Sequence, residues 1–288
     1  MHGKDRTAPS RTPDLCVTSL PAMQVAACPP RHARLADLVK QIWMVRGDRG
    51  AQTHQRIMPT GVVELIFSLA DPQQFRCPER HTLRLTPTCV VNGFKSTAVD
   101  LHLAGHQDFF GVQLASYAPR LLFGIAASEL TDKIVGGHDL HPGLAEVHAA
   151  LMQAATFAAR VVVIERYLLT QLDHAHASPW RMADATLLGA RGGVAGAAAG
   201  VGLSERQFRR LWHQWHGISP EAFTQIERCV AALGAVHGSR RKLTDIAADF
   251  GYWDQAHFIR HFRKVFGISP SDYRRQARPT DPPGQLVL

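Results

Sequence analysis

Residues 202–223 read GLSERQFRRLWHQWHGISPEAF, and residues 251–273 read GYWDQAHFIRHFRKVFGISPSDY. The two stretches repeat one pattern. Each begins with glycine, has an arginine two residues after a phenylalanine, and ends in Gly-Ile-Ser-Pro and then an aromatic residue. The first glycine lies 15 residues before the glycine of Gly-Ile-Ser-Pro in one copy and 16 residues before it in the other. The chain therefore contains two copies of one small structural unit.

Each copy has the residues that begin and end a helix. Gly202 and Gly251 supply a flexible turn before the helix. Ser204 and Gln207 form a capping box at the first helix, and Asp254 caps the second. Apolar residues then recur at helical spacing and predict one buried stripe per copy. The stripes consist of Phe208, Leu211, Trp212 and Trp215 in the first copy and Phe258, Phe262, Val265 and Phe266 in the second. Since a short alanine-rich helix precedes each glycine turn, each copy predicts a helix-turn-helix.

The opposite face of each predicted helix carries arginine and other side chains suited to base recognition. Arginine forms bidentate hydrogen bonds with guanine, glutamine pairs with adenine, and small apolar groups meet the thymine methyl. One such stripe alone would favour a solvated charged surface, but two stripes in matching positions favour DNA recognition. The candidate DNA-binding residues are Arg206, Arg209, Arg210, Gln255, Ala256, Ile259, Arg260 and Arg263.

Residues 222–238 predict a connecting helix that holds the two units apart. Adjacent major grooves on one face of double-stranded DNA lie ~34 Å apart. A single chain could therefore contact two adjacent major grooves.

Composition and charge agree with this interpretation. Of the 288 residues, 45% are hydrophobic and 19% are charged, which excludes wholesale disorder. No apolar run approaches the ~18 residues of a membrane span. The first thirty residues lack the apolar core of a signal peptide. We therefore expect a cytoplasmic protein with no membrane partner. The net charge is +8, and residues 180–288 hold 15 basic and 9 acidic side chains, so +6 of it lies there. A polyanion partner for the C-terminal part follows.

The N-terminal part has a β-rich pattern. Turn signals separate apolar runs at residues 62–69, 88–92, 97–103 and 109–114, as expected for strands of a barrel or sandwich. Asn92-Gly93 is a candidate hairpin turn, since both residues tolerate a positive φ. From residue 144 to 172 the pattern is that of a long amphipathic helix.

Glu64 is the one candidate effector-binding residue, because it lies within the apolar run at residues 62–69. By strand alternation it shares a face with Val62 and Ile66. It either anchors a ligand, faces solvent, or is buried with a partner. We expect no metal, cofactor or catalytic residue. The chain has 16 histidines but no H-E-x-x-H motif, and its five cysteines include no C-x-x-C pair.

Residues 180–276 resemble the DNA-binding domain of AraC/XylS-family bacterial transcription regulators, most closely at residues 244–275. The resemblance implies seven helices with two helix-turn-helix units, whose second helices enter the major groove. Trp253 departs from the family pattern, which usually has a small serine there. Residues 58–69, 92–94 and 109–114 resemble the cupin-like sensor domain of many such regulators, which implies an unknown small-molecule effector.

We expect an α+β chain in which a β-rich, cupin-like barrel or sandwich precedes an all-α domain with two helix-turn-helix units. The predicted boundaries are a disordered lead-in at 1–34, a sensor domain at 35–172, a linker at 173–179, a DNA-binding domain at 180–277 and a disordered tail at 278–288. The predicted function is sequence-specific transcription regulation, with RNA polymerase and a second copy of the chain as further partners. The alternatives are a cupin-like or DNA-modifying enzyme targeted to DNA, and a non-specific architectural DNA binder.

Overall fold

Two antiparallel sheets form the N-terminal part of the molecule. The computed structural model describes residues 16–20, 23–48, 53–70, 74–76, 83–103, 105–173, 193–277 and 285–287. One sheet has the strand order β1-β2-β3-β10-β5-β8-β11, and the other has the order β12-β4-β9-β6-β7. The strands are β1 (Cys16–Leu20), β2 (Met23–Cys28), β3 (Val39–Asp48), β4 (Thr53–Ile57), β5 (Val63–Ser68), β6 (Gln74–Arg76), β7 (Leu83–Leu85), β8 (Cys89–Asn92), β9 (Val99–Leu103), β10 (His106–Leu114), β11 (Ile134–Gly136) and β12 (Gln285–Val287).

Helices cover one face of the larger sheet. The short 3-10 helix η1 (Ala33–Leu35) precedes β3, and five α-helices follow or interrupt the sheet strands. These five are α1 (Ala118–Phe123), α2 (Ala127–Leu130), α3 (Gly137–Leu140), α4 (Gly143–Gln153) and α5 (Phe157–Asp173). Phe67 of β5 stacks on His148 of α4, and Phe110 of β10 packs against Phe157 of α5. The apolar runs that form β5 and β10 therefore bury one face of their strands under α4 and α5.

Strand alternation gives the larger sheet a second, inner face. Val63, Leu65 and Phe67 of β5 belong to the core under the helices. Ile66 and Ser68, on the other side of β5, line a cavity together with Leu101 and Leu103 of β9 in the smaller sheet. The space between the two sheets is therefore partly open rather than filled.

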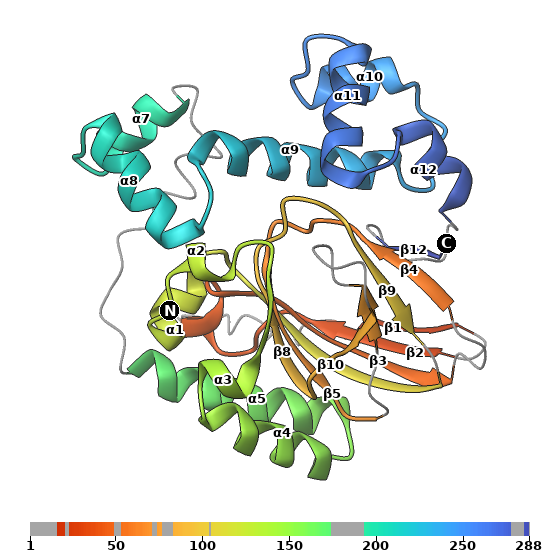
Figure 1. Cartoon of the computed structure of the whole chain (residues 1–288), viewed down its shortest axis with the longest axis vertical. Coiled ribbons are helices and arrows are strands. Elements are labelled where there is room, and N and C mark those ends of the chain that lie inside the picture. The colour runs from red at the N-terminus through yellow and green to blue at the C-terminus, as the bar shows by residue number, and fades with distance from the viewer. Residues whose placement is uncertain are drawn as a thin grey trace, which may run out of the picture.

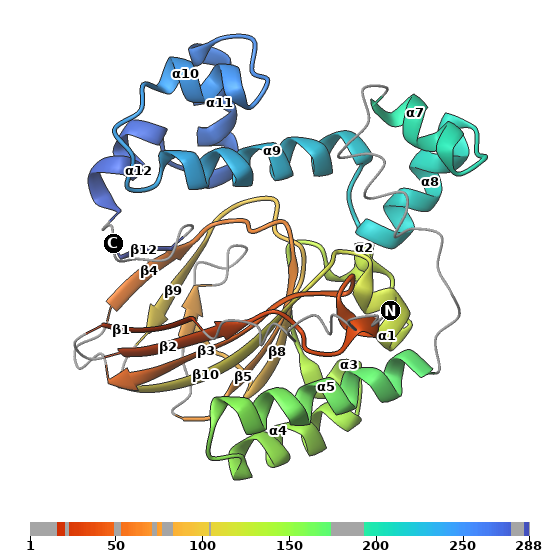
Figure 2. The same ribbon diagram turned by 180° about the vertical axis from the view of Figure 1, so that it is seen from behind.

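The C-terminal part is helical. Its described helices are α7 (Gly193–Gly200), α8 (Glu205–His216), α9 (Pro220–Val236), α10 (Leu243–Asp249), α11 (Gln255–Phe266) and α12 (Pro270–Gln276). The 17 residues of α9 span about 25 Å at ~1.5 Å per residue. Helices α7 and α8 lie at one end of α9, and α10 to α12 lie at the other (Figure 1). Seen from behind, α9 lies on one side of the two-sheet domain, and α4 and α5 lie on another (Figure 2).

The predicted α+β class is confirmed, since a β-rich part precedes a helical part. The strands predicted at 62–69, 88–92, 97–103 and 109–114 are also confirmed, as β5, β8, β9 and β10. The linker predicted at 173–179 lies outside the described residues except for Asp173, the last residue of α5.

The disordered ends predicted at 1–34 and 278–288 are wrong in part. Strands β1 and β2 fall within the first of these ranges, and β2 pairs with β3 from Met23 to Cys28. This pairing buries Met23, Ala26 and Cys28. At the other end of the chain, β12 pairs with β4 over three residue pairs, the first of which is Gln285 with Ile57. Both segments are short, and they join the sheets through pairing with β3 and β4, which local composition does not reveal.

The hairpin turn predicted at Asn92-Gly93 is also wrong. Strand β8 pairs with β5 and β11, whereas β9, which follows it in the chain, belongs to the other sheet. Gly93 has no positive φ. A Cβ on Gly93 would lie 1.7 Å from the carbonyl oxygen of Leu130 in α2. Glycine is needed there for close approach to α2, not for a turn.

The helix expected over residues 144–172 is divided into α4 and α5. The hydroxyl of Thr156 accepts a hydrogen bond from the backbone N–H of Ala159 and so caps α5. The Arg160 guanidinium donates to the Ala154 carbonyl and forms a buried, bidentate pair with Asp108 of β10, at 2.6 and 2.9 Å. This pair fixes the start of α5 against the sheet.

Candidate nucleic-acid interface

The two predicted recognition helices are equivalent in structure. Helices α8 and α11 each have 12 residues and begin 50 residues apart, at Glu205 and Gln255. Ser204 forms the expected capping box with Gln207, and the Asp254 carboxylate accepts a 2.6 Å hydrogen bond from the backbone N–H of His257. Both helices end at a glycine in the left-handed region, with φ of 78° at Gly217 and 70° at Gly267. The predicted caps and ends of both helices are confirmed. The predicted apolar stripe is buried throughout in α11, whereas in α8 Leu211 and Trp215 are only partly buried.

The turns before the two helices have the same backbone hydrogen bond and differ by one inserted residue. The backbone N–H of Leu203 donates to the Ala198 carbonyl at 2.9 Å, and that of Tyr252 donates to the Ala247 carbonyl at the same distance. Leu203 is followed directly by the cap residue of α8, whereas Trp253 lies between Tyr252 and the cap residue of α11. The extra residue, Trp253, is 92% exposed. The sequence marked Trp253 only as a departure from the family pattern, and its exposure is what makes it a candidate contact residue.

The outward faces of the two helices present side chains to solvent. Arg206 and Arg210 are exposed on α8. On α11, Ile259 is half-buried, and the exposed candidates are Gln255, Ala256, Arg260 and Arg263. Among the described residues, no carboxylate forms an ion pair with Arg206, Arg210, Arg260 or Arg263. These four guanidinium groups are therefore available to an anionic partner.

Arg209 differs from the other candidates. Its guanidinium contacts Glu221 of α9 at 2.9 Å and Glu205 of its own helix at 2.8 Å. Hydrogen bonds to Glu221 and then Glu205 raise the pKa of Arg209. Its charge is therefore already partnered by protein carboxylates, and it ties α8 to α9.

The second unit contains a buried polar cluster. The Tyr252 hydroxyl lies 3.2 Å from Cys229 Sγ and 3.1 Å from His261 Nδ1. Burial raises the pKa of the Cys229 thiol to about 11. His261 is thus turned inward and away from the exposed face of α11. Within the described residues, no group of three His, Cys, Asp or Glu side chains could hold a metal ion.

The C-terminal end of α8 packs against the N-terminal domain. His216 is fully buried, and its Nδ1 lies 2.7 Å from the Ser116 hydroxyl. The Thr131 hydroxyl contacts the Gly217 carbonyl at 3.2 Å. A Cβ on Gly217 would lie 2.1 Å from that hydroxyl oxygen, so the contact leaves no room for a side chain. Burial lowers the pKa of His216 to about 3, so its imidazole is neutral here.

Helix α9 makes a second contact with the N-terminal domain. Phe94, which follows β8, packs against Phe223 of α9 with ring centroids 5.9 Å apart. The Glu227 carboxylate lies directly over Gly61, where a Cβ would be 1.9 Å from Oε1. Burial raises the pKa of Glu227 to about 7, against the opposing effect of Lys40. We call these contacts of α8 and α9 with the N-terminal domain the interdomain joint. The N-terminal domain contributes Ser116, Thr131, Phe94 and Gly61, and the two helices and their ends contribute His216, Gly217, Phe223 and Glu227.

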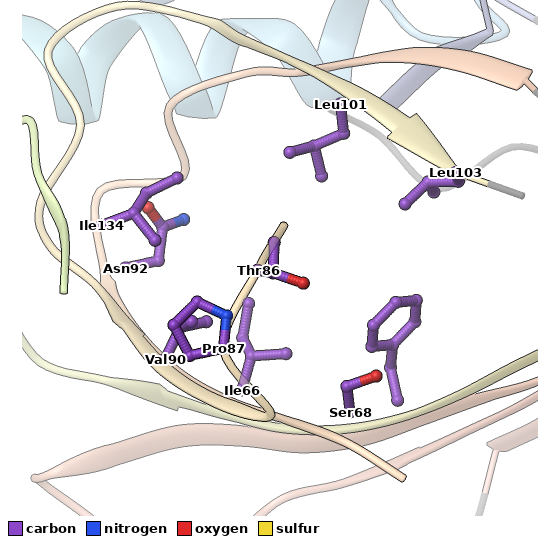
Figure 3. Close-up of a pocket in the computed structure, with 10 residues that line it drawn as sticks. Ile66, Ser68, Thr86, Pro87, Val90, Asn92, Leu101, Leu103 and Ile134 are labelled. Carbon is purple, nitrogen blue, oxygen red and sulfur yellow. The ribbon is translucent and has the colours of Figure 1, made fainter. Parts of the chain in front are cut away.

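A cavity of about 80 Å³ lies between the two sheets (Figure 3). The side chains of Leu101 and Leu103 approach it from one side and those of Ile66 and Val90 from the other (Figure 3). Among the described residues, its lining is Ile66, Ser68, Thr86, Pro87, Val90, Asn92, Leu101, Leu103, Phe109 and Ile134. The Asn92 Oδ1 atom is buried and has no hydrogen-bond partner in the described part of the chain.

Glu64 is buried beside this cavity but does not line it. It lies opposite Gln113 on one neighbouring strand and Asn92 on the other. The Gln113 side-chain amide donates to Glu64 Oε1 at 3.2 Å. Burial raises the pKa of Glu64, while its hydrogen bonds with Gln113 and Asn92 lower it. The sequence left three arrangements open for Glu64, and in the structure its side chain is buried with hydrogen-bond partners. A role for Glu64 in ligand binding stays a prediction.

Comparison with known proteins agrees with this geometry. Residues 197–276 match the family described as a helix-turn-helix domain, and residues 27–136 match a domain of unknown function (DUF6597). The C-terminal part of the chain is thus a helix-turn-helix domain, and it is one of the AraC type.

Two of the curated relatives match over about a quarter of this chain. An uncharacterized HTH-type transcriptional regulator of Haemophilus influenzae is 33% identical over 73 residues, which are 25% of this chain and 24% of that protein. The HTH-type transcriptional activator RhaR of Yersinia pseudotuberculosis is 32% identical over 74 residues, 26% of each protein. The match thus spans about a quarter of the length of these relatives.

Solved structures with a similar arrangement include ToxT from Vibrio cholerae with an unsaturated fatty acid bound. That comparison covers 94% of this chain and 99% of ToxT, at 7% identity and a TM-score of 0.46. An AraC-type transcriptional regulator from Chromobacterium violaceum is 24% identical, with 35% of this chain and 91% of that chain covered and a TM-score of 0.32. Among the described residues, no helix combines the length and apolar character needed to cross a membrane.

Proposed function

We propose that the chain is a sequence-specific DNA-binding transcription regulator in which α8 and α11 each enter a major groove of double-stranded DNA. The observation that carries the proposal is the pair of equivalent, exposed helix faces at the two ends of α9, whose arginines Arg206, Arg210, Arg260 and Arg263 form no ion pair with any described residue. Arginine can hold guanine through two hydrogen bonds, and such contacts distinguish one base pair from another. Two faces on one chain would contact two adjacent grooves.

The same faces favour sequence recognition over general DNA packaging. Ala256 and Ile259 add apolar contacts suited to a thymine methyl, and Gln255 adds a side-chain amide suited to adenine. An architectural binder needs phosphate contacts but none of these. We propose that Arg206, Arg210, Arg260 and Arg263 contact DNA directly, and that Arg209 orients α8 through Glu221.

We further propose that a small molecule bound in the N-terminal domain controls DNA binding. Val90 and Asn92 line the cavity, and the next two residues of the chain, Gly93 and Phe94, contact α2 and α9. Helix α2 also packs against α8. Residues in direct contact therefore connect the cavity wall to the interdomain joint, and the joint to the first helix-turn-helix unit.

Two further partners and one alternative function stay open to test. RNA polymerase and a second copy of the chain are proposed partners to which we assign no residues. The alternative is an enzyme, cupin-like or DNA-modifying, targeted to DNA by its helical domain. Elemental analysis of the purified chain discriminates between the functions, because a stoichiometric transition metal would favour the enzyme.

The experiment that tests the proposal is selection of duplex DNA from a random library by the full chain. We expect enrichment of one motif, and binding that weakens steeply as salt rises, because phosphate contacts release counterions. A protein that binds all duplexes equally would be an architectural binder. A protein that binds none would overturn the proposal.

A further inference from the structure

We propose that Trp253 contacts the methyl group of a thymine in the DNA half-site of α11, and so sets a preference for thymine at one base pair. The half-site of a recognition helix means the base pairs that lie under that helix. This role for Trp253 rests on the DNA binding proposed above and adds one specificity-determining residue to it.

Trp253 is far more exposed than tryptophan usually is in a folded protein. It is 92% exposed, whereas the other exposed large apolar side chains among the described residues, Leu85, Met152 and Val162, are at most 64% exposed. Helices α10 and α11 lie on the opposite side of α9 from the two sheets, so the sheets do not cover the turn between them (Figures 1 and 2). Exposed tryptophan is enriched among the residues that carry binding energy when a partner buries them.

The folding of the second unit does not account for Trp253. Both units make the same backbone hydrogen bond before the recognition helix and have a cap residue at its start, yet the first unit completes this turn with one residue fewer. The neighbours of Trp253 hold the turn. Tyr252 is buried and packs against Phe258 with ring centroids 5.0 Å apart, and Asp254 caps α11. The indole is therefore an addition to a turn that is already complete.

The position of Trp253 favours a contact with base edges over a contact with phosphates. In helix-turn-helix proteins, the N-terminal residues of the recognition helix contact base edges in the major groove. Gln255 and Ala256, in the first turn of α11, are exposed, and Trp253 lies two residues before Gln255. Asp254 lies between Trp253 and Gln255, and its negative charge would repel a phosphate group at this point.

The chemistry of the indole selects thymine among the four bases. The ring is apolar except for one N–H group, and the C5-methyl of thymine is the apolar group that base edges present in the major groove. The other three bases offer hydrogen-bond donors and acceptors there. Burial of one methyl-sized group changes a dissociation constant about fourfold.

The test replaces each thymine of the selected motif with uracil, one at a time, and measures the affinity of the full chain for each duplex by fluorescence anisotropy. Uracil lacks only the C5-methyl and still pairs with adenine. The half-site of α11 is the one that contains the base pair whose preference changes in Arg260→Lys. The natural chain, Trp253→Ser and Trp253→Phe are measured on every duplex, and thermal unfolding checks that both variants fold.

We expect one thymine in the half-site of α11 at which uracil weakens binding of the natural chain about fourfold. The same exchange should have no effect on binding by Trp253→Ser. Trp253→Phe keeps an apolar ring and should retain an effect of about twofold or more. Thymines in the half-site of α8 are the matched control, and uracil there should have the same effect on all three proteins.

Three outcomes would overturn the role of Trp253. If Trp253→Ser weakens the thymine and uracil duplexes by the same factor, the indole lies against the sugar-phosphate backbone. If Trp253→Ser leaves every affinity unchanged, the indole lies away from DNA. A natural chain that shows no effect of uracil in the half-site of α11 overturns the role without any variant.

Failure of this role and failure of DNA binding itself are distinguishable. A natural chain that selects no motif from the random library removes the DNA-binding proposal, and the role of Trp253 falls with it. A natural chain that selects a motif but shows no thymine whose effect depends on Trp253 removes only the role of Trp253.

Discussion

Replacing Glu227 with glutamine should stabilise the chain at alkaline pH and leave it unchanged at acid pH. The carboxylate lies over Gly61 in the interdomain joint, and no ion pair with Glu227 is formed by the described residues. Glutamine has the same shape and no charge. The substitution therefore removes one property, the ability to ionise, from a contact between α9 and the N-terminal domain.

The size and sign of the effect follow from the pKa. Burial raises the pKa of Glu227 from 4.5 to about 7. The carboxyl thus contributes stability that is fully present below its unfolded pKa and is lost as the pH rises through 7. Each pKa unit corresponds to about 1.4 kcal/mol, which makes the loss about 3 kcal/mol at most. Because water reaches part of the side chain, we expect Glu227→Gln to add about 1–3 kcal/mol at pH ~8 and nothing at pH ~4.

The assay is urea unfolding of the full chain at several pH values. Glu221→Gln, on the same helix, is the matched control. Burial raises the pKa of Glu221, but its backbone hydrogen bond and Arg209 outweigh burial and hold the pKa below the ordinary value. Glu221→Gln should therefore cost up to about 1 kcal/mol at neutral pH, the opposite sign. A Glu227→Gln variant that is no more stable than the natural chain at alkaline pH, or equally stabilised at every pH, would refute the reasoning.

Two further predictions concern His216 and Trp253. Burial favours the neutral form of His216, so its contribution to the free energy of unfolding is complete above its unfolded pKa of about 6.5 and is lost as the pH falls toward 3. The loss is up to about 1.4 kcal/mol per pH unit. Phe266 occupies the equivalent position in the second copy, and His216→Phe should flatten the acid side of a thermal-unfolding profile; an unchanged slope would show that His216 is not its source. Trp253→Ser should weaken DNA binding about fivefold, as loss of one favourable contact of ~1 kcal/mol does, and leave thermal stability unchanged. Full affinity in that variant would place Trp253 away from DNA.

The helix-turn-helix units could be predicted from the sequence because their determinants are local. The helix caps, turn glycines and apolar stripe of one unit lie within about 20 residues of one another, and each of these features occurs in both copies of the repeat. Arg209 shows the limit of this approach, since its position on the helix suggested a DNA contact while Glu221, on the next helix, engages its charge.

The interdomain joint and the edge strands could not be predicted. His216 contacts Ser116, 100 residues away, and the sequence shows only a histidine where the second copy has phenylalanine. Asn92-Gly93 has the composition of a turn, but the partners of β8 were decided by long-range pairing. Long-range contacts of this kind depend on the topology of the fold, which local sequence patterns do not indicate.

Arg210 and Arg260 test the central claim most directly, because they occupy equivalent positions in the two copies. Replacing either with lysine keeps the charge and removes the planar fork that holds guanine. The measurement is the base preference of each variant over the selected DNA motif. We predict that each variant loses about 1–3 kcal/mol of discrimination at one base pair, and that the two affected base pairs lie about one helical turn apart. Equal weakening on all sequences, or loss of preference at the same base pair in both variants, would contradict the account.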